Sequence, residues 1–272
     1  MNFASDLFVT ILKNIKTDIR LYTYKQFLPD KPRHDDVWIV EYPKSGVTWL
    51  SFLIANVNTR MSAATTEVNF FNINDFVPDI HSLRCINEAS KTSFPGFRLI
   101  KSHSDYNPFY YKVIYLVRDP RSVMISYHKF LSGLQQYSGS VSSLIRDKRH
   151  GIDAWVKHVS GWINKVSIDK RIYFIRYEDL LDNTALSVSN LYQHLGLVVP
   201  GEVVKDAVNA SSRERMMGLE EEWKKGDIRY SQKLKDFIFV GGTKHKASDL
   251  SATDIEYIDK SAADIMKIFG YV

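Results

Sequence analysis

The sequence predicts an α/β fold in which a mostly parallel central sheet is flanked by helices on both faces. Short segments rich in β-branched and aromatic residues alternate with longer segments whose apolar residues recur at helical spacing. Three of the short segments end at polar turns that lead into helices, as in parallel strands joined by crossovers. We expect the strands at residues 37–42, 97–101, 113–117 and 172–177. The loops that follow such strands meet at one edge of the sheet, where ligands bind.

Length and composition predict one domain that spans residues 1–272. The chain has 272 residues and 44% hydrophobic content, which is enough to bury a sizeable core. Residues 1–20 predict an amphipathic helix whose apolar face packs on this core. Alternatively, that face contacts a membrane surface or a partner protein. The last helix is expected to begin at Ser251 and to end near Gly270. A single cysteine and an N-terminus without signal-peptide features lead us to expect a cytoplasmic protein.

The segment Tyr-Pro-Lys-Ser-Gly-Val-Thr-Trp, at 42–49, predicts an anion site between the first strand and a helix. The strand ends at Pro43, and the backbone N–H groups of residues 45–48 are expected to be unpaired at the helix start. Gly46 permits an unusual backbone conformation, and Lys44 adds a positive charge. In a nucleotide triphosphatase loop the lysine follows the glycine, whereas here it precedes it. The segment therefore indicates a phosphate site of another type.

This segment resembles the 5′-phosphosulfate loop of the cytosolic-type sulfotransferases. Those enzymes transfer a sulfuryl group from 3′-phosphoadenosine 5′-phosphosulfate (PAPS) to a hydroxyl or an amine, leaving adenosine 3′,5′-bisphosphate (PAP). The resemblance implies a P-loop-type strand–loop–helix nucleotide site in this chain. The implied donor contacts are Lys44, Ser45, Gly46, Val47, Thr48 and Trp49. Lys44 and Thr48 are expected to stabilise the negative charge that develops on the leaving phosphate.

A second strand-to-helix segment, at 113–127, predicts another phosphate contact. Asp119 is a suitable N-cap and Pro120 a suitable first helical residue, so a helix is expected to begin there. Arg118 then lies at the carboxyl end of the strand and Ser126 about two turns into the helix, where both can reach one anion beside the first loop. Arginine can give a phosphate two parallel hydrogen bonds. The resemblance implies that Arg118 and Ser126 bind the 3′-phosphate of PAPS.

His103 is the candidate general base. It follows the strand-like run at 97–101, and a histidine with an unperturbed pKa near 6.5 is suited to accept a proton at neutral pH. The order Lys101-Ser102-His103 resembles the family's Lys-Ser/Thr-His turn, whose histidine deprotonates the acceptor. We therefore expect His103 and Lys44 to be the catalytic residues.

Two further segments are similar to parts of the family's adenine site. Residues 171–181 resemble the later strand with its Tyr-Glu-Asp turn, which implies that Tyr177 lies near adenine and stacks on it. Packing at the strand end is the alternative role for Tyr177. Ser212 occupies a position where family members often have a Thr-Ser pair near adenine. The resemblance therefore assigns Tyr177 and Ser212 to the nucleotide-binding set.

The chain departs from the family pattern near residues 239–246. Family members commonly have an Arg-Lys pair there that binds the 3′-phosphate, but this sequence reads Phe-Val-Gly-Gly-Thr-Lys-His-Lys. The backbone of Gly241 and Gly242 can form an anion-binding nest, and Lys244, Lys246 or Arg229 can supply the missing charge. A solvated basic loop is the alternative interpretation of this segment.

Taken with the resemblance, these motifs predict an enzyme that transfers a sulfuryl group in line from PAPS to an acceptor hydroxyl. A sugar or glycan, a lipid headgroup and a small alcohol or phenol remain open as acceptors. We expect no metal, because the sequence has no spaced cluster of ligand residues. A net charge of +5 suits a polyanionic nucleotide, and without an Arg/Lys-rich run it does not indicate nucleic-acid binding. The oligomeric state remains open.

Two alternatives remain at this point. A nucleotide-dependent kinase on a P-loop-type scaffold would need a triphosphate loop and a metal-binding carboxylate, neither of which we can place in the sequence. A PAP-binding protein that has lost catalysis is favoured by the altered segment at 239–246.

Overall fold

The computed structural model describes residues 24–62, 65–81, 97–166, 170–226 and 249–272. Four strands form its sheet: β1 (Asp36–Glu41), β2 (Arg98–Ser102), β3 (Lys112–Val117) and β4 (Ile172–Arg176). Their order is β2-β1-β3-β4, and each neighbouring pair is parallel. The predicted α/β class and all four predicted strands are confirmed, with strand ends that differ by one residue.

Helices follow three of the strands, as the sequence predicted. The described helices are α2 (Val47–Met61), α3 (Ile73–Phe76), α5 (Pro120–Gly133), α6 (Val141–Ile145), α7 (Ile152–Val166), α8 (Tyr177–Asp182), α9 (Thr184–His194), α10 (Gly201–Ala210), α11 (Arg213–Gly226) and α13 (Ala252–Ile268). The side chain of Asp119 accepts a hydrogen bond from the backbone N–H of Arg121 and caps α5. Ser251 caps α13 in the same way. Both predicted helix starts are confirmed.

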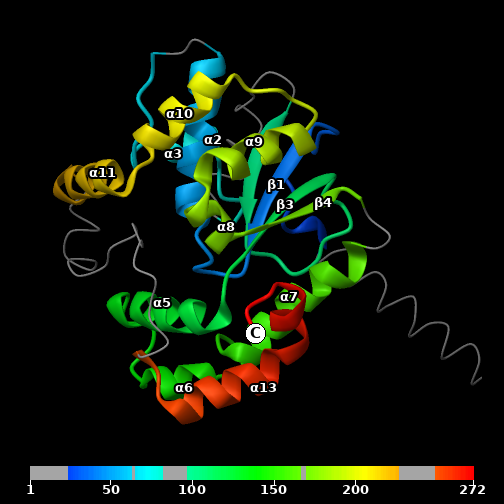
Figure 1. The fold of residues 1–272 in the computed structure, drawn as a ribbon, viewed down its shortest axis with the longest axis vertical. Coiled ribbons are helices and arrows are strands. Elements are labelled where there is room, and N and C mark those ends of the chain that lie inside the picture. Colours follow the sequence, from blue (N-terminus) through cyan, green and yellow to red (C-terminus); the bar gives the residue numbers. More distant parts are fainter. Residues whose placement is uncertain (1–23, 63–64, 82–96, 167–169, 227–248) are drawn as a thin grey trace, which may run out of the picture.

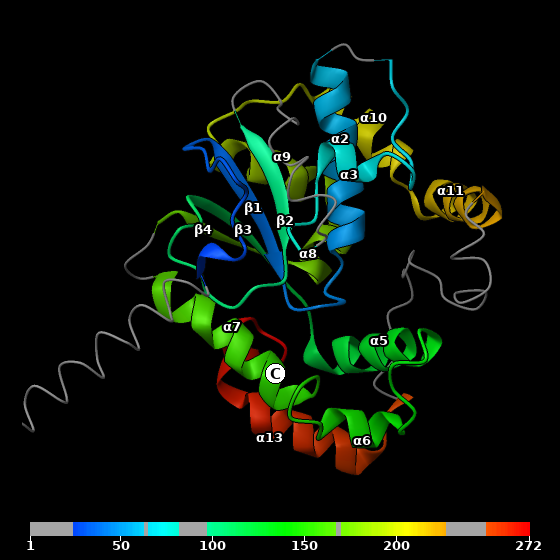
Figure 2. The same cartoon turned by 180° about the vertical axis from the view of Figure 1, so that it is seen from behind.

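Every residue of β1 is buried, because helices cover both faces of the sheet. Val37 and Ile39 point into a core shared with α2, α8, α9 and α10. Trp38 and Val40 point into a second core shared with α5, α7 and α13. Figures 1 and 2 show these two groups of helices on opposite sides of the sheet. The carboxyl ends of the strands, where the predicted loops begin, lie between the two groups.

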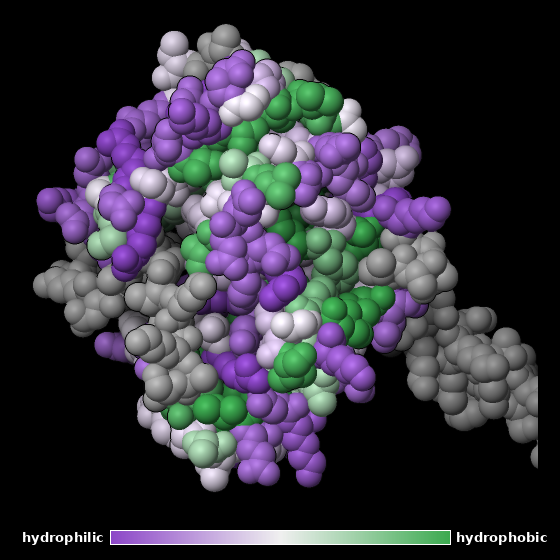
Figure 3. Space-filling view, viewed as in Figure 1, coloured by the Kyte–Doolittle hydropathy of each residue, from purple (hydrophilic) through white to green (hydrophobic). Residues whose placement is uncertain are grey.

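Some predicted features lie outside the described residues. These are the amphipathic helix at 1–20 and the site candidates Arg229, Gly241, Gly242, Lys244 and Lys246. On the face of the molecule in Figure 3, hydrophilic and hydrophobic residues are interspersed. In the described part of the chain, no helix combines the length and the apolar character that crossing a membrane requires.

Candidate active site

The loop between β1 and α2 has a backbone that only a few residue types adopt readily. Lys44 and Gly46 both have positive φ angles, 76° and 117°. A Cβ atom on Gly46 would lie 2.5 Å from Cδ2 of Tyr177, so this position requires glycine for space as well as for conformation. Positive φ at a lysine is uncommon, and strained positions of this kind cluster at functional sites.

The backbone donors of this loop are only partly available. Ser45 N–H donates to the carbonyl of Tyr42 at 3.2 Å, and Val47 N–H donates to the Glu41 carboxylate at 2.8 Å. The prediction of unpaired N–H groups is therefore wrong for Ser45 and Val47. The Ser45 hydroxyl also donates to the Tyr42 carbonyl, at 2.8 Å. Both donors of Ser45 are thus used within the loop. Its side chain is buried and does not line the cavity described below.

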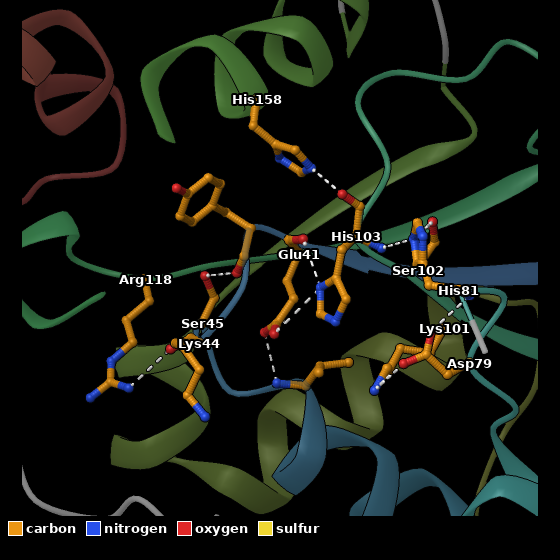
Figure 4. Close-up of polar contacts among 12 residues, drawn as sticks. Glu41, Lys44, Ser45, Asp79, His81, Lys101, Ser102, His103, Arg118 and His158 are labelled. Carbon is orange, nitrogen blue, oxygen red and sulfur yellow. Dashed lines mark hydrogen bonds and ion pairs between the residues drawn. The ribbon is translucent and has the colours of Figure 1, made fainter. Parts of the chain in front are cut away.

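Arg118 joins the second loop to the first. Its Nη1 donates to the carbonyl of Lys44 at 3.3 Å, as Figure 4 shows, and its guanidinium carbon lies 4.3 Å from the centre of the Tyr177 ring. The side chain is almost fully buried. The structure therefore places the two loops side by side, as the sequence predicted, and adds Tyr177 as the surface on which the guanidinium rests.

A cavity of about 370 Å³ lies between these loops. It brings together most of the predicted site residues: Lys44, Gly46, Val47, Thr48, Trp49, His103, Arg118, Ser126, Tyr177 and Ser212. Among the described residues that line it, four cationic side chains, Lys44, Lys101, Arg118 and Arg213, face the cavity with one carboxylate, Glu41. This excess of positive charge suits a ligand with several negative charges.

Contacts from α2 hold the segment at 211–213 against the cavity. Trp49 Nε1 donates to the carbonyl of Ser211 at 3.0 Å, and the Asn56 side-chain amide donates to the Ser211 hydroxyl at 3.1 Å. These bonds bring Ser212 and Arg213 to the site, although they are more than 160 residues from Trp49 in sequence.

His103 is held by three polar contacts (Figure 4). Its backbone N–H donates to Nε2 of His81 at 2.9 Å, and its carbonyl accepts from Nε2 of His158 at 3.2 Å. Its ring Nδ1 lies 3.3 Å from the carbonyl oxygen of Glu41. Because a carbonyl only accepts, Nδ1 of His103 must hold the ring proton in the neutral imidazole, which leaves Nε2 free to accept one.

Burial changes the protonation of the site. It lowers the pKa of His103 to about 3, with a further reduction from the charge of Lys101, so the expected pKa near 6.5 is wrong. The imidazole is neutral across the physiological range. Burial also lowers the pKa of Lys44 to about 8 and raises the pKa of Glu41 to about 7. A bound anion nearby would raise the pKa of each of these three groups.

Glu41, Lys101 and Arg213 line the cavity but were not predicted as site residues. Glu41 had a detectable signal, since a carboxylate within a buried apolar strand requires a partner. Lys101 was quoted only as part of a motif, and the structure pairs it with Asp79 at 2.8 Å. Arg213 had no local signal, because tertiary contacts bring its segment to the cavity.

The fold and the cavity define an α/β protein with a site for a polyanionic ligand at a strand–loop–helix turn. The family model described as "Sulfotransferase domain" matches residues 34–270. The chain therefore belongs to the sulfotransferase domain family. This assignment agrees with the resemblance seen in the sequence and disfavours the kinase alternative.

Curated relatives and solved structures agree with this family. The chain is 31% identical to sulfotransferase 4A1 of Homo sapiens over 182 residues, which cover 61% of each chain. The match thus spans about three fifths of that relative's length. It is 26% identical to sulfotransferase 1E1 of Bos taurus over 220 residues, covering 71% of this chain and 72% of the relative.

Two solved structures have a similar fold. Mouse sulfotransferase SULT7A1 complexed with PAP superposes with a TM-score of 0.63 and 18% identity, covering 89% of this chain and 86% of that one. Retinol dehydratase in a complex with retinol and PAP gives a TM-score of 0.66 and 19% identity, covering 87% and 82%. At this level of identity the likeness shows a shared fold.

Proposed function

We propose that this protein transfers a sulfuryl group from PAPS to an acceptor hydroxyl. The observation that carries the proposal is the arrangement of the cavity, in which two strand-to-helix loops and His103 meet around a set of cationic side chains. The family assignment and the PAP bound in two similar structures support PAPS as the donor.

In this proposal the two loops bind the two ends of one nucleotide. Lys44, Thr48 and Trp49 hold the 5′ end at the start of α2, where the helix dipole adds positive potential. Arg118 and Ser126 hold the 3′-phosphate. Tyr177 and Ser212 lie near the adenine. The Arg118 guanidinium already lies over the Tyr177 ring, so in this proposal the base shares that aromatic surface with it.

His103 is the proposed base. Its neutral imidazole has a free Nε2, which takes the proton of the acceptor hydroxyl as the new O–S bond forms. Lys44 neutralises the charge that develops on the departing phosphate oxygen. A resting pKa of about 3 makes the imidazole a weak base, so proton transfer depends on negative charge nearby that stabilises the protonated ring.

The acceptor is proposed to be a small molecule or a glycan that presents a hydroxyl. Two retinol dehydratase structures are complexes with androsterone and PAP and with retinol and PAP. A second cavity, of about 630 Å³, adjoins His103 on the side of Tyr127, Asp153 and Lys157. It gives a hydroxyl compound a route to the ring from outside the nucleotide cavity.

Arg118→Ala is expected to remove most of the selectivity for the 3′-phosphate. Losing the charged, hydrogen-bonded partner of a phosphate should weaken PAP binding by at least about 10-fold. Binding of adenosine 5′-phosphate, which lacks the 3′-phosphate, should change much less. Isothermal titration of both nucleotides measures the ratio. Equal loss for both nucleotides would show that Arg118 serves the other end of the ligand.

PAP binding is expected to weaken as the pH rises from 6.5 to 9. Lys44 loses its charge as the pH passes its pKa of about 8, and Glu41 gains charge as the pH passes its pKa of about 7. Both changes reduce the attraction for an anion, by roughly 10-fold in total over this range. Titrations at constant ionic strength measure the trend. Affinity that rises with pH would contradict these assignments.

The proposed function is tested by transfer of label from radiolabelled PAPS to a mixed panel of phenols, alcohols, steroids and sugars. PAP binding without magnesium is measured alongside. Labelled product supports the sulfotransferase. PAP binding without product on any acceptor would instead support the catalytically inactive PAP-binding protein, and tight binding of ATP that requires magnesium would support a kinase.

A further inference from the structure

Glu41 is a buried carboxylate next to the proposed base. Its side chain is 2% exposed, and the residue ends β1, directly before the loop that leads into α2. Two oxygens of this one residue face Nδ1 of His103: the backbone carbonyl at 3.3 Å and carboxylate Oε1 at 3.9 Å. Figure 4 shows the ring with Nδ1 turned toward Glu41 and the other ring nitrogen turned away.

The second carboxylate oxygen has a different partner. Oε2 of Glu41 accepts the backbone N–H of Val47 at 2.8 Å, in the first residue of α2. One carboxylate therefore contacts both the donor-binding helix and the proposed base. Because Val47 fixes Oε2, the group has a defined orientation, and Oε1 is the oxygen directed at the imidazole.

The other charged groups around His103 are already engaged. Lys101 Nζ forms an ion pair with Asp79 at 2.8 Å, and the other carboxylate oxygen of Asp79 accepts the N–H of His81 at 3.0 Å. His81 uses Nε2 to accept from the backbone of His103, so its own proton is on Nδ1 in the neutral ring. Of the carboxylates of Glu41 and Asp79, the Glu41 carboxylate is the one directed at a ring nitrogen of His103.

We propose that Glu41 is a positioning residue for His103: its carbonyl and carboxylate oxygens keep the ring proton on Nδ1, and its negative charge stabilises the imidazolium that forms during transfer. This inference rests on the proposed function. The acceptor O–H gives its proton to Nε2, the acceptor oxygen bonds to sulfur, and the bond between sulfur and the phosphate oxygen breaks. The Glu41 carboxylate then stabilises the positive charge on the ring, and the imidazolium later gives its proton to water.

The arrangement is similar in logic to a carboxylate that orients a catalytic histidine in a triad. Burial raises the pKa of Glu41 to about 7, so the carboxylate is partly protonated at rest. A positive imidazolium at 3.9 Å favours its ionised form. The charge on Glu41 is therefore strengthened at the step in which it is needed.

Glu41→Gln tests the proposal because it removes the charge and keeps the shape. The Val47 N–H requires an oxygen at the Oε2 position, which turns the new NH₂ group toward Nδ1 of His103. An amide donor at that place favours the ring tautomer with the proton on Nε2, which cannot act as the base. We expect kcat to fall at least about 10-fold. PAP affinity should stay the same or increase, since a negative charge has left the anion site.

Two variants make this result specific. Glu41→Asp keeps the charge and should retain more activity than Glu41→Gln. Asp254→Asn removes a buried carboxylate in the first turn of α13, which accepts a hydrogen bond from the hydroxyl of the capping Ser251, and it should leave kcat unchanged while lowering the melting temperature. A role in folding alone would lower stability or PAP affinity without the selective loss of kcat. That pattern, or unchanged kcat in Glu41→Gln, would overturn the proposal.

Nitrogen-15 NMR of the His103 ring gives a second readout that does not depend on turnover. The wild-type protein should show the proton on Nδ1, and Glu41→Gln should shift the population toward Nε2. A wild-type ring protonated on Nε2 would overturn the positioning role. Because this signal needs no acceptor, failure of the proposed function, seen as no transfer with any acceptor, is distinguishable from failure of the Glu41 assignment.

Discussion

His103→Ala is expected to lower kcat by about 10²- to 10⁴-fold while PAP affinity stays nearly unchanged. In the proposed mechanism the imidazole supplies the base. Its Nδ1 contacts Glu41, whereas the bonds to His81 and His158 are made by the His103 backbone and do not depend on the ring. Removing the ring therefore removes the proposed proton acceptor and leaves the two strand-to-helix loops in place. Initial rates with labelled PAPS and isothermal titration with PAP measure the two quantities on the same preparation.

His194→Ala is a suitable control for this experiment. His194 is an exposed histidine in the last turn of α9, where its ring stacks on Tyr173, and it does not line the nucleotide cavity. Its loss should leave kcat unchanged. If His103→Ala lost PAP binding in proportion to its activity, His103 would be a nucleotide contact, and its assignment as the base would be wrong.

Lys44→Met is expected to reduce both kcat and PAP affinity. The Lys44 ammonium lies 4.6 Å from the centre of the Phe130 ring and lines the cavity, so methionine keeps the apolar contact and removes the charge. Loss of a cation that meets the departing phosphate should lower kcat by about 10²- to 10³-fold. PAP binding should weaken by at least about 10-fold. The same assays measure both effects.

Lys205→Ala provides the matched control, since Lys205 is an exposed residue of α10 outside the cavity. Circular dichroism should show that Lys44→Met keeps its helix content. A variant with full kcat and weaker binding alone would place Lys44 in ground-state binding and remove it from the catalytic role.

The sequence predicted the parts of the fold that local patterns determine. Buried strands are recognisable from β-branched and aromatic runs, and the start of α5 from Asp119 and Pro120, because these signals act within a few residues. The closeness of the two strand-to-helix loops followed from parallel topology, since the carboxyl ends of β1 and β3 must lie at one edge of the sheet.

Other features of the site depend on tertiary contacts that no local pattern encodes. The pKa of His103 differs from its unperturbed value because the folded chain buries the ring and the charge of Lys101 acts on it, and burial cannot be read from a single turn. Glu41 contacts two parts of the site, because its carboxylate accepts the Val47 N–H and also faces His103. Its partners become visible once the chain is folded.

The central claim is that one nucleotide with two phosphates spans the two neighbouring loops beside His103. The most direct test is a crystal structure of the protein with PAP. We expect the 5′-phosphate at the start of α2 beside Lys44 and the 3′-phosphate within hydrogen-bond distance of Arg118 and Ser126. PAP bound elsewhere, or bound with Arg118 and Ser126 out of reach of its 3′-phosphate, would contradict the account.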